Sequence, residues 1–245
     1  MRRKTGSSKP AATWVAGVDG CRGGWFVILR DVTHRRFRYR RVDHFKDLLL
    51  LPEAPVAIAV DIPIGLLSAA EYGGRLCDRE ARKLLGWPRR NSVFSPPVYA
   101  ALSCNSYATA KKMNRRSSKY GMGISQQCYG LLDKLREVHS VMKPSLQERI
   151  FEVHPEVCFM KAAGRSMKNR KKHSSGYLER KGFLNDFLEV IQELENTSVP
   201  NVGRDDVLDA CVACWTATRF YRHEAEPILS NRPRCNRGLK MEIWF

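Results

Sequence analysis

The chain has no long apolar run. No stretch approaches the roughly 20 consecutive apolar residues that a membrane-spanning helix requires. The chain starts with Met-Arg-Arg-Lys-Thr-Gly-Ser-Ser-Lys-Pro, which is polar and lacks the pattern of a secretory signal. We therefore expect a cytoplasmic protein without a membrane partner.

Acidic residues are scarce relative to basic ones. There are 25 Asp and Glu against 42 Lys and Arg, which gives a formal net charge of +17. Such an excess of positive charge attracts polyanions, so nucleic acid is the first partner to expect. A length of 245 residues with 43% hydrophobic content suits one folded domain with an ample core.

Several common site patterns are also missing. Only one of the cysteine pairs is closely spaced, Cys211 and Cys214, and it falls inside a helical apolar pattern without a second pair at zinc spacing. We expect reduced thiols that pack in the core. No Ser-His-Asp or Cys-His arrangement is recognisable. The glycine-rich segment 17–24 leads into an expected strand and not into a helix, which argues against a dinucleotide-binding motif.

What the sequence does contain is the periodicity of an α/β fold. Short apolar or alternating runs predict five strands, and a short helix capped by Asp43 separates the third from the fourth. That helix allows the fourth strand to lie parallel to the first. The prediction is a mixed five-stranded sheet of order 3-2-1-4-5 flanked by helices, with strands at 13–19, 25–30, 36–40, 56–60 and 149–153.

The remaining segments predict helices, an insertion and loops. We expect a disordered basic arm over 1–12, a single domain over 13–245, and a helical insertion at about 65–120. The basic segment 161–172 has the Gly, Ser and Asn content of a mobile loop, and 241–245 alternates like a strand. Helices are expected at 78–85, 98–113, 124–142, 184–194 and 205–222.

Acidic residues end several of these elements. Asp19, Asp61 and Glu152 close or follow apolar strands, and Asp206 and Asp209 lie three apart on the last helix. Carboxylates that meet at one sheet edge can hold two Mg²⁺ or Mn²⁺ ions about 4 Å apart and support phosphodiester hydrolysis. Asp19 is the expected bridging ligand, Asp61 holds one ion, and Asp206 or Asp209 holds the other. Glu152 is a fourth ligand or orients water.

Each of these acids also has a structural interpretation that the sequence leaves open. Asp19 can cap a glycine turn, Asp61 can begin a turn before Pro63, and Asp205 or Asp206 can cap a helix. Glu152 can pair with an arginine of the insertion. The alternating segment 36–40 predicts either a charge-protected edge strand or a phosphate-contacting face.

Long motifs give the chain a family resemblance. It resembles domain-of-unknown-function family 429, described as predicted nucleases with a ribonuclease H-like fold, and the likeness covers nearly everything after residue 13. The Asp206-Val-Leu-Asp209-Ala segment is also similar to the late acidic helix of Holliday-junction resolvases. The family motifs are Gly-Val-Asp-Gly-Cys-Arg-Gly-Gly-Trp (17–25), Val-Asp-Ile-Pro-Ile-Gly-Leu (60–66), Cys-Asp-Arg-Glu-Ala-Arg-Lys-Leu-Leu-Gly (77–86), Ser-Val-Phe-Ser-Pro-Pro-Val (92–98) and Phe-Glu-Val-His-Pro-Glu-Val (151–157).

The leading hypothesis is a metal-dependent nuclease acting on DNA or RNA. Its expected backbone-binding residues are Arg22, Arg89, Arg90, Lys171 and Lys172. One alternative is an ATP-dependent phosphotransferase of the actin and sugar-kinase type, although a single lobe argues against it. Another is a nucleic-acid-binding protein without catalysis.

Overall fold

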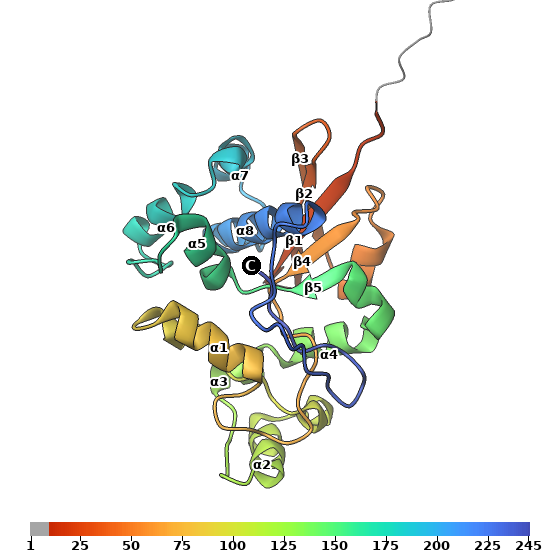
Figure 1. The fold of residues 1–245 in the computed structure, drawn as a ribbon, viewed down its shortest axis with the longest axis vertical. Coiled ribbons are helices and arrows are strands. Elements are labelled where there is room, and N and C mark those ends of the chain that lie inside the picture. Colours follow the sequence, from red (N-terminus) through yellow and green to blue (C-terminus); the bar gives the residue numbers. More distant parts are fainter. Residues whose placement is uncertain (1–9) are drawn as a thin grey trace, which may run out of the picture.

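The computed structural model describes residues 10–245, so most of the arm expected over 1–12 lies outside the described residues. The described chain forms one sheet with helices on both of its faces (Figure 1). The strands are β1 (Trp14–Cys21), β2 (Gly24–Asp31), β3 (Arg36–Val42), β4 (Ala57–Val60) and β5 (Ile150–Glu152). The longer helices are α1 (Leu76–Leu85), α2 (Tyr107–Ser117), α3 (Gln126–Gly130), α4 (Leu132–Val141), α5 (Pro155–Ala163), α6 (Ser174–Lys181), α7 (Leu188–Thr197) and α8 (Arg204–Tyr221). Short 3-10 helices are η1 (Phe45–Leu50), η2 (Arg89–Ser92), η3 (Tyr99–Ser103), η4 (Pro144–Glu148) and η5 (Asn185–Phe187).

The sheet has the predicted topology. Its order is β3-β2-β1-β4-β5, with β1 parallel to β4, β4 parallel to β5, and the β1-β2-β3 meander antiparallel. The β1–β2 hairpin turns at Gly23, whose φ of 72° suits a residue without a Cβ. The expected α/β class and strand order are confirmed.

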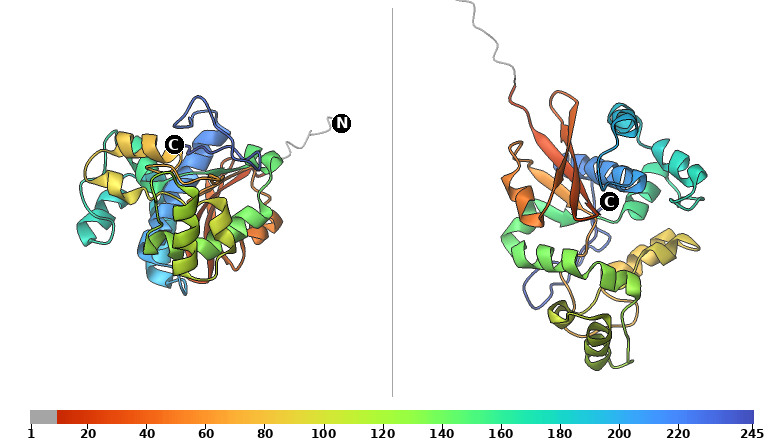
Figure 2. Two further views of the ribbon diagram at one scale, coloured as in Figure 1. Left: turned by 90° about the horizontal axis from the view of Figure 1, so that it is seen from below. Right: turned by 180° about the vertical axis from the view of Figure 1, so that it is seen from behind.

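The pleat sends alternate side chains of the sheet into two separate apolar layers. Val18 of β1 and Val60 of β4 lie in one layer, which packs under η1, α1 and α4. Phe26 of β2 and Ala59 of β4 lie in the other, which is covered by α5, α7 and α8. Figure 2 shows α4 crossing one face of the sheet and α8 the other.

Helix α8 lies directly against the backbone of β1. A Cβ at Gly17 would overlap Cys214 N and Ala210 O of α8, so only glycine permits this approach. Cys211 and Cys214 are buried in the same contact, as expected of core residues. All eight cysteines, which belong to the described part of the chain, are buried and free.

Several predicted boundaries were wrong for local reasons. The helix expected at 98–113 is divided, because Ser106 accepts a hydrogen bond from Thr109 N and starts α2 there. The helix expected at 124–142 breaks at Leu131 into α3 and α4. The cap of the first short helix is His44 and not Asp43, whose carboxylate pairs with Arg41.

The C-terminal half contains further differences between the predicted elements and the structure. The segment 241–245 makes isolated bridges through Trp244 where a strand was expected. The expected mobile loop at 161–172 begins inside α5, and its remainder is held in place. Glu179 accepts hydrogen bonds from Lys168 N at 3.0 Å and Asn169 N at 2.8 Å, and Arg180 donates to Asn169 O at 3.1 Å.

The arginines of β3, which is an edge strand of the sheet, form ion pairs with buried acids. Arg38 and Arg40 both pair with buried Glu53, and Arg36 pairs with buried Asp31. These contacts give the three arginines partners within the protein, which favours the edge-strand interpretation over a phosphate-contacting face. Within residues 10–245, no helix is both long and apolar enough to cross a membrane.

Candidate carboxylate site

Two of the acids come together because their strands are parallel and in register. Val18 of β1 pairs with Val60 of β4, and Asp61 N donates to Val18 O at 2.9 Å. Asp19 and Asp61 are the next residue on each strand, so both side chains point away from the layer that holds the two valines. They therefore face α8.

Helix α8 supplies the third carboxylate. Asp209 lies one residue before Ala210, whose carbonyl touches β1 at Gly17. One carboxylate oxygen from each of Asp19, Asp61 and Asp209 lies within 4.8 Å of the other two. The structure thus brings together three of the five predicted acids, and we call these three residues the carboxylate triad.

Burial and mutual repulsion make the triad reluctant to ionise in the absence of a cation. Burial first, and then the carboxylates of Asp61 and Asp209, raise the pKa of Asp19 well above its ordinary value. Burial first, and then the carboxylate of Asp209, raise the pKa of Asp61 to about 8, although Lys171 opposes the rise. Burial also raises the pKa of Asp209, although Lys171 opposes the rise. A divalent cation would relieve this repulsion, since oxygen donors are the ligands that Mg²⁺ and Mn²⁺ prefer.

Lys171 is the nearest positive charge to the triad. Its Nζ donates to Asp209 Oδ2 at 2.6 Å and lies 3.7 Å from Asp205 Oδ2. Burial lowers the pKa of Lys171, but the carboxylates of Asp209, Asp19 and Asp61 raise it overall, so the ammonium form is retained. The lysine is held by the anchored loop described above.

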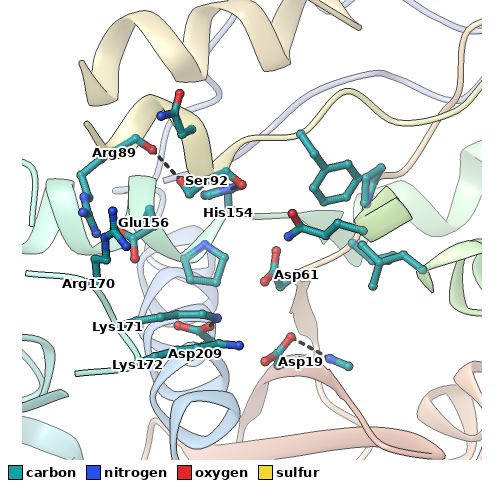
Figure 3. A pocket seen from close by; sticks show the side chains of 18 of the residues that line it. Asp19, Asp61, Arg89, Ser92, His154, Glu156, Arg170, Lys171, Lys172 and Asp209 are labelled. Atoms are coloured by element: carbon teal, nitrogen blue, oxygen red, sulfur yellow. Dashed lines mark hydrogen bonds and ion pairs between the residues drawn. The ribbon is translucent and has the colours of Figure 1, made fainter. Parts of the chain in front are cut away.

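The triad forms part of the floor of a cavity of about 690 Å³. Figure 3 shows Asp19 and Asp61 on one side, with Asp209 across from them beside Lys171 and Lys172, and with Arg89 and Arg170 further along that basic side. Trp87 also lines the cavity, and 79% of its surface is exposed. Arg89 donates to Asn169 O at 3.2 Å, which ties η2 to the loop that carries Lys171.

Three buried polar atoms of residues that line this cavity lack partners among the described residues, and one of them is Arg89 Nε. Glu156 lines the cavity and is 6% exposed, yet its Oε2 accepts no hydrogen bond, while its Oε1 is held by Arg180. His154 Nδ1 is likewise unpartnered. Buried polar groups without partners are uncommon in proteins, so we expect ordered water or a ligand to bind these atoms.

A family model for proteins of unknown function, DUF429, matches residues 17–234. The chain belongs to this family. The matched region contains all of the carboxylate triad and the loop with Lys171. No curated protein and no solved structure matches the chain.

Glu152 of this DUF429 chain lies on the other side of the sheet. It pairs in register with Val60, so the pleat directs its side chain into the layer opposite Asp61. There Arg75 Nη1 donates to Glu152 Oε2 at 2.7 Å, and Ile64 N donates to the same oxygen at 2.7 Å. Pairing with an arginine of the insertion, one of the two interpretations left open by the sequence, describes its position.

Asp206 lies in the first turn of α8. Its Oδ2 accepts a hydrogen bond from Gly203 N at 2.8 Å, which caps the helix. Its charge still contributes to the raised pKa of Asp19. Asp206 therefore borders the triad without belonging to it.

The predicted basic residues divide into two groups. Lys171, Lys172 and Arg89 line the cavity. Arg22 and Arg90 are exposed and lie outside the residues that line it. Sequence reasoning missed Glu156, although it belongs to the quoted Phe-Glu-Val-His-Pro-Glu-Val motif. The signal was Pro155, which is suited to the first turn of a helix and predicts that α5 begins where Glu156 can face the sheet edge.

Proposed function

We propose that this DUF429 protein is a metal-dependent nuclease with a ribonuclease H-like fold. The observation that carries the proposal is the convergence of Asp19, Asp61 and Asp209 from two parallel strands and the last long helix. A mixed sheet of order 3-2-1-4-5 with acids at these places is the arrangement expected of such a fold. The substrate class is a phosphodiester of DNA or RNA, and the eight free buried thiols suit a cytoplasmic location.

The residues around the triad suit the chemistry of phosphodiester hydrolysis. A bound Mg²⁺ or Mn²⁺ ion would polarise a phosphoryl oxygen and make a bound water more acidic. The triad would hold that cation, while Arg89, Arg170 and Lys172 offer positive charge to the flanking phosphates. Glu156 also lines the cavity, and its Oε2 has no partner among the described residues.

The test is incubation of the purified protein with single-stranded, duplex, hybrid and branched nucleic acids. Mg²⁺, Mn²⁺ and a chelator are compared. We expect cleavage only with metal, and its loss in the Asp19→Asn and Asp209→Asn variants. Asp133→Asn is the matched control, since its side chain is 88% exposed on α4 outside the cavity. Metal-dependent cleavage by purified Asp19→Asn protein at the wild-type rate would remove the triad from the mechanism.

Other outcomes would identify the two alternatives. ATP binding in a thermal-shift assay, without any effect of nucleic acid, would favour a phosphotransferase. Salt-sensitive binding of nucleic acid without turnover would favour a binding protein that lacks catalysis.

A further inference from the structure

Lys171 contacts a carboxylate that the sequence predicts as a ligand of a second cation. Two-ion sites need several carboxylates, and the second ion was assigned to Asp209 with Asp206 as the other candidate. In the structure, Asp209 Oδ2 instead receives a hydrogen bond from the ammonium group of Lys171 at 2.6 Å. Asp206 caps α8 through Gly203.

Two other acids near the triad do not join it as ligands. Glu152 is held by Arg75 on the opposite side of the sheet, and Glu156, whose Oε1 is held by Arg180 and whose Oε2 has no partner, lies outside the group of candidate ligands. Within residues 10–245, Asp19, Asp61 and Asp209 form the one group of three or more candidate ligands. The carboxylates available to coordinate cations are therefore few.

The local charge fits one divalent cation. The three carboxylates of the triad and the ammonium of Lys171 together carry two negative charges when ionised, which a single Mg²⁺ or Mn²⁺ ion balances. A second ion would have to approach Lys171, and two positive charges at such short range repel strongly.

We infer that this site binds one divalent cation. The ammonium group of Lys171 takes the place of the second cation by neutralising charge on a phosphoryl oxygen. The inference rests on the proposed nuclease function. An ammonium has three N–H donors, and in Lys171 one of them is given to Asp209, which leaves others for a phosphoryl oxygen of the substrate. In the reaction a water oxygen bonds to phosphorus and releases a proton to solvent, while the ester P–O bond breaks. The electron pair of that bond leaves on the alkoxide oxygen, which takes up a proton, while Lys171 neutralises charge on the phosphoryl oxygen.

Lys171 is placed for this work by contacts that do not involve the triad. Glu179 and Arg180 of α6 hold the backbone at residues 168–169. A Cβ at Gly176 would overlap Arg170 O, so the loop also lies directly on α6. The lysine is therefore preorganised by the fold.

The experiment combines metal binding with cleavage in wild type, Lys171→Met and Lys168→Met. Lys168 belongs to the same loop, is exposed and lies outside the cavity, so it is the matched control. Isothermal titration with Mn²⁺ should give one ion per wild-type chain. Lys171→Met should bind Mn²⁺ about tenfold more tightly, because a competing positive charge is gone. The same variant should cleave roughly 100- to 1,000-fold more slowly, as expected on losing a donor to the reacting phosphoryl group.

Chemical rescue distinguishes this role from a structural one. The native cysteines are all buried, so the new thiol of Lys171→Cys is the one expected to react with 2-bromoethylamine under native conditions. The thiolate displaces bromide and restores an ammonium at nearly the original position. Restored cleavage supports the inference. Two Mn²⁺ ions per wild-type chain, parallel loss of Mn²⁺ binding and cleavage in Lys171→Met, or failure of the alkylated protein to recover would each overturn it. A wild-type protein that neither binds Mn²⁺ nor cleaves any substrate would refute the proposed function itself.

Discussion

Burial of Asp61 and its repulsion by Asp209 predict that removing the charge of Asp61 stabilises the metal-free protein. Asp61→Asn is the cleanest perturbation, since the side chain of Asp61 makes no hydrogen bond or ion pair with the described residues, whereas Asp19 accepts from Gly20 N and Asp209 pairs with Lys171. The pKa of Asp61 is raised from 3.8 to about 8 in the folded protein. The folded state thus holds a proton that the unfolded chain releases, and its stability falls as pH rises from about 4 to 8.

The size of the effect follows from the same pKa. Between pH 5 and pH 8 this group lowers the free energy of unfolding by at most about 4 kcal/mol, since each pH unit contributes about 1.4 kcal/mol. We expect Asp61→Asn to recover only about 2 kcal/mol of this free energy at pH 8. The gain is partial because the buried amide has no hydrogen-bond partner in the cavity. For a chain of this length that corresponds to a melting temperature roughly 4 to 8 °C higher. At pH 5 the gain should be much smaller.

The assay is thermal unfolding of both proteins in chelator at pH 5 and pH 8, repeated at pH 8 with Mn²⁺. Added Mn²⁺ should stabilise the wild type, since a cation that binds only the folded state shifts the equilibrium toward it. The variant should respond far less. A variant destabilised by the same amount at both pH values would refute the claim that the carboxylates repel one another in the folded state.

Two further predictions concern residues on either side of the triad. Arg75→Met should lower the free energy of unfolding by about 3 to 5 kcal/mol in urea denaturation, because it leaves the buried carboxylates of Glu152 and Asp78 without their shared cation. The control is Lys83→Met, which removes an exposed ion pair on α1. Equal losses in the two variants would contradict the buried role of Arg75. Trp87→Ala should weaken binding of a single-stranded oligonucleotide by about 1 to 3 kcal/mol in fluorescence anisotropy, because an exposed indole beside the cavity can stack on a base. Tyr120→Ala, at a residue that is 68% exposed outside the cavity, should bind normally, and comparable losses in both variants would rule out stacking at Trp87.

The sequence was sufficient to predict which acids meet where the direction of a side chain followed from the alternation of residues along a strand. Asp19 and Asp61 each follow a buried valine on parallel strands, so their meeting could be predicted from the topology alone. Glu152 could not be placed in this way, because β5 is short and buried throughout, and only its register against Val60 decides which face the carboxylate takes. Register between distant segments is set by packing of the whole sheet.

Lys171 shows a second limit of sequence reasoning. Its Gly-, Ser- and Asn-containing surroundings predicted a mobile loop, yet Glu179 and Arg180 from the next helix fix that loop in space. Hydrogen bonds between the side chains of a following helix and the backbone of a loop produce no recognisable pattern in the sequence. The basic character of the residue was predictable, and its contact with Asp209 was not.

The close approach of α8 to β1 at Gly17 also limits how this site can be modified. Since the two backbones already touch there, no side chain between them can be shortened to let the helix settle nearer, and any enlargement would force it away. The gap between Asp19 and Asp209 therefore behaves as a fixed dimension of the fold. Attempts to retune the protein for a larger ion such as Ca²⁺ would therefore have to change the length of a carboxylate side chain, because the spacing of the two backbones cannot change.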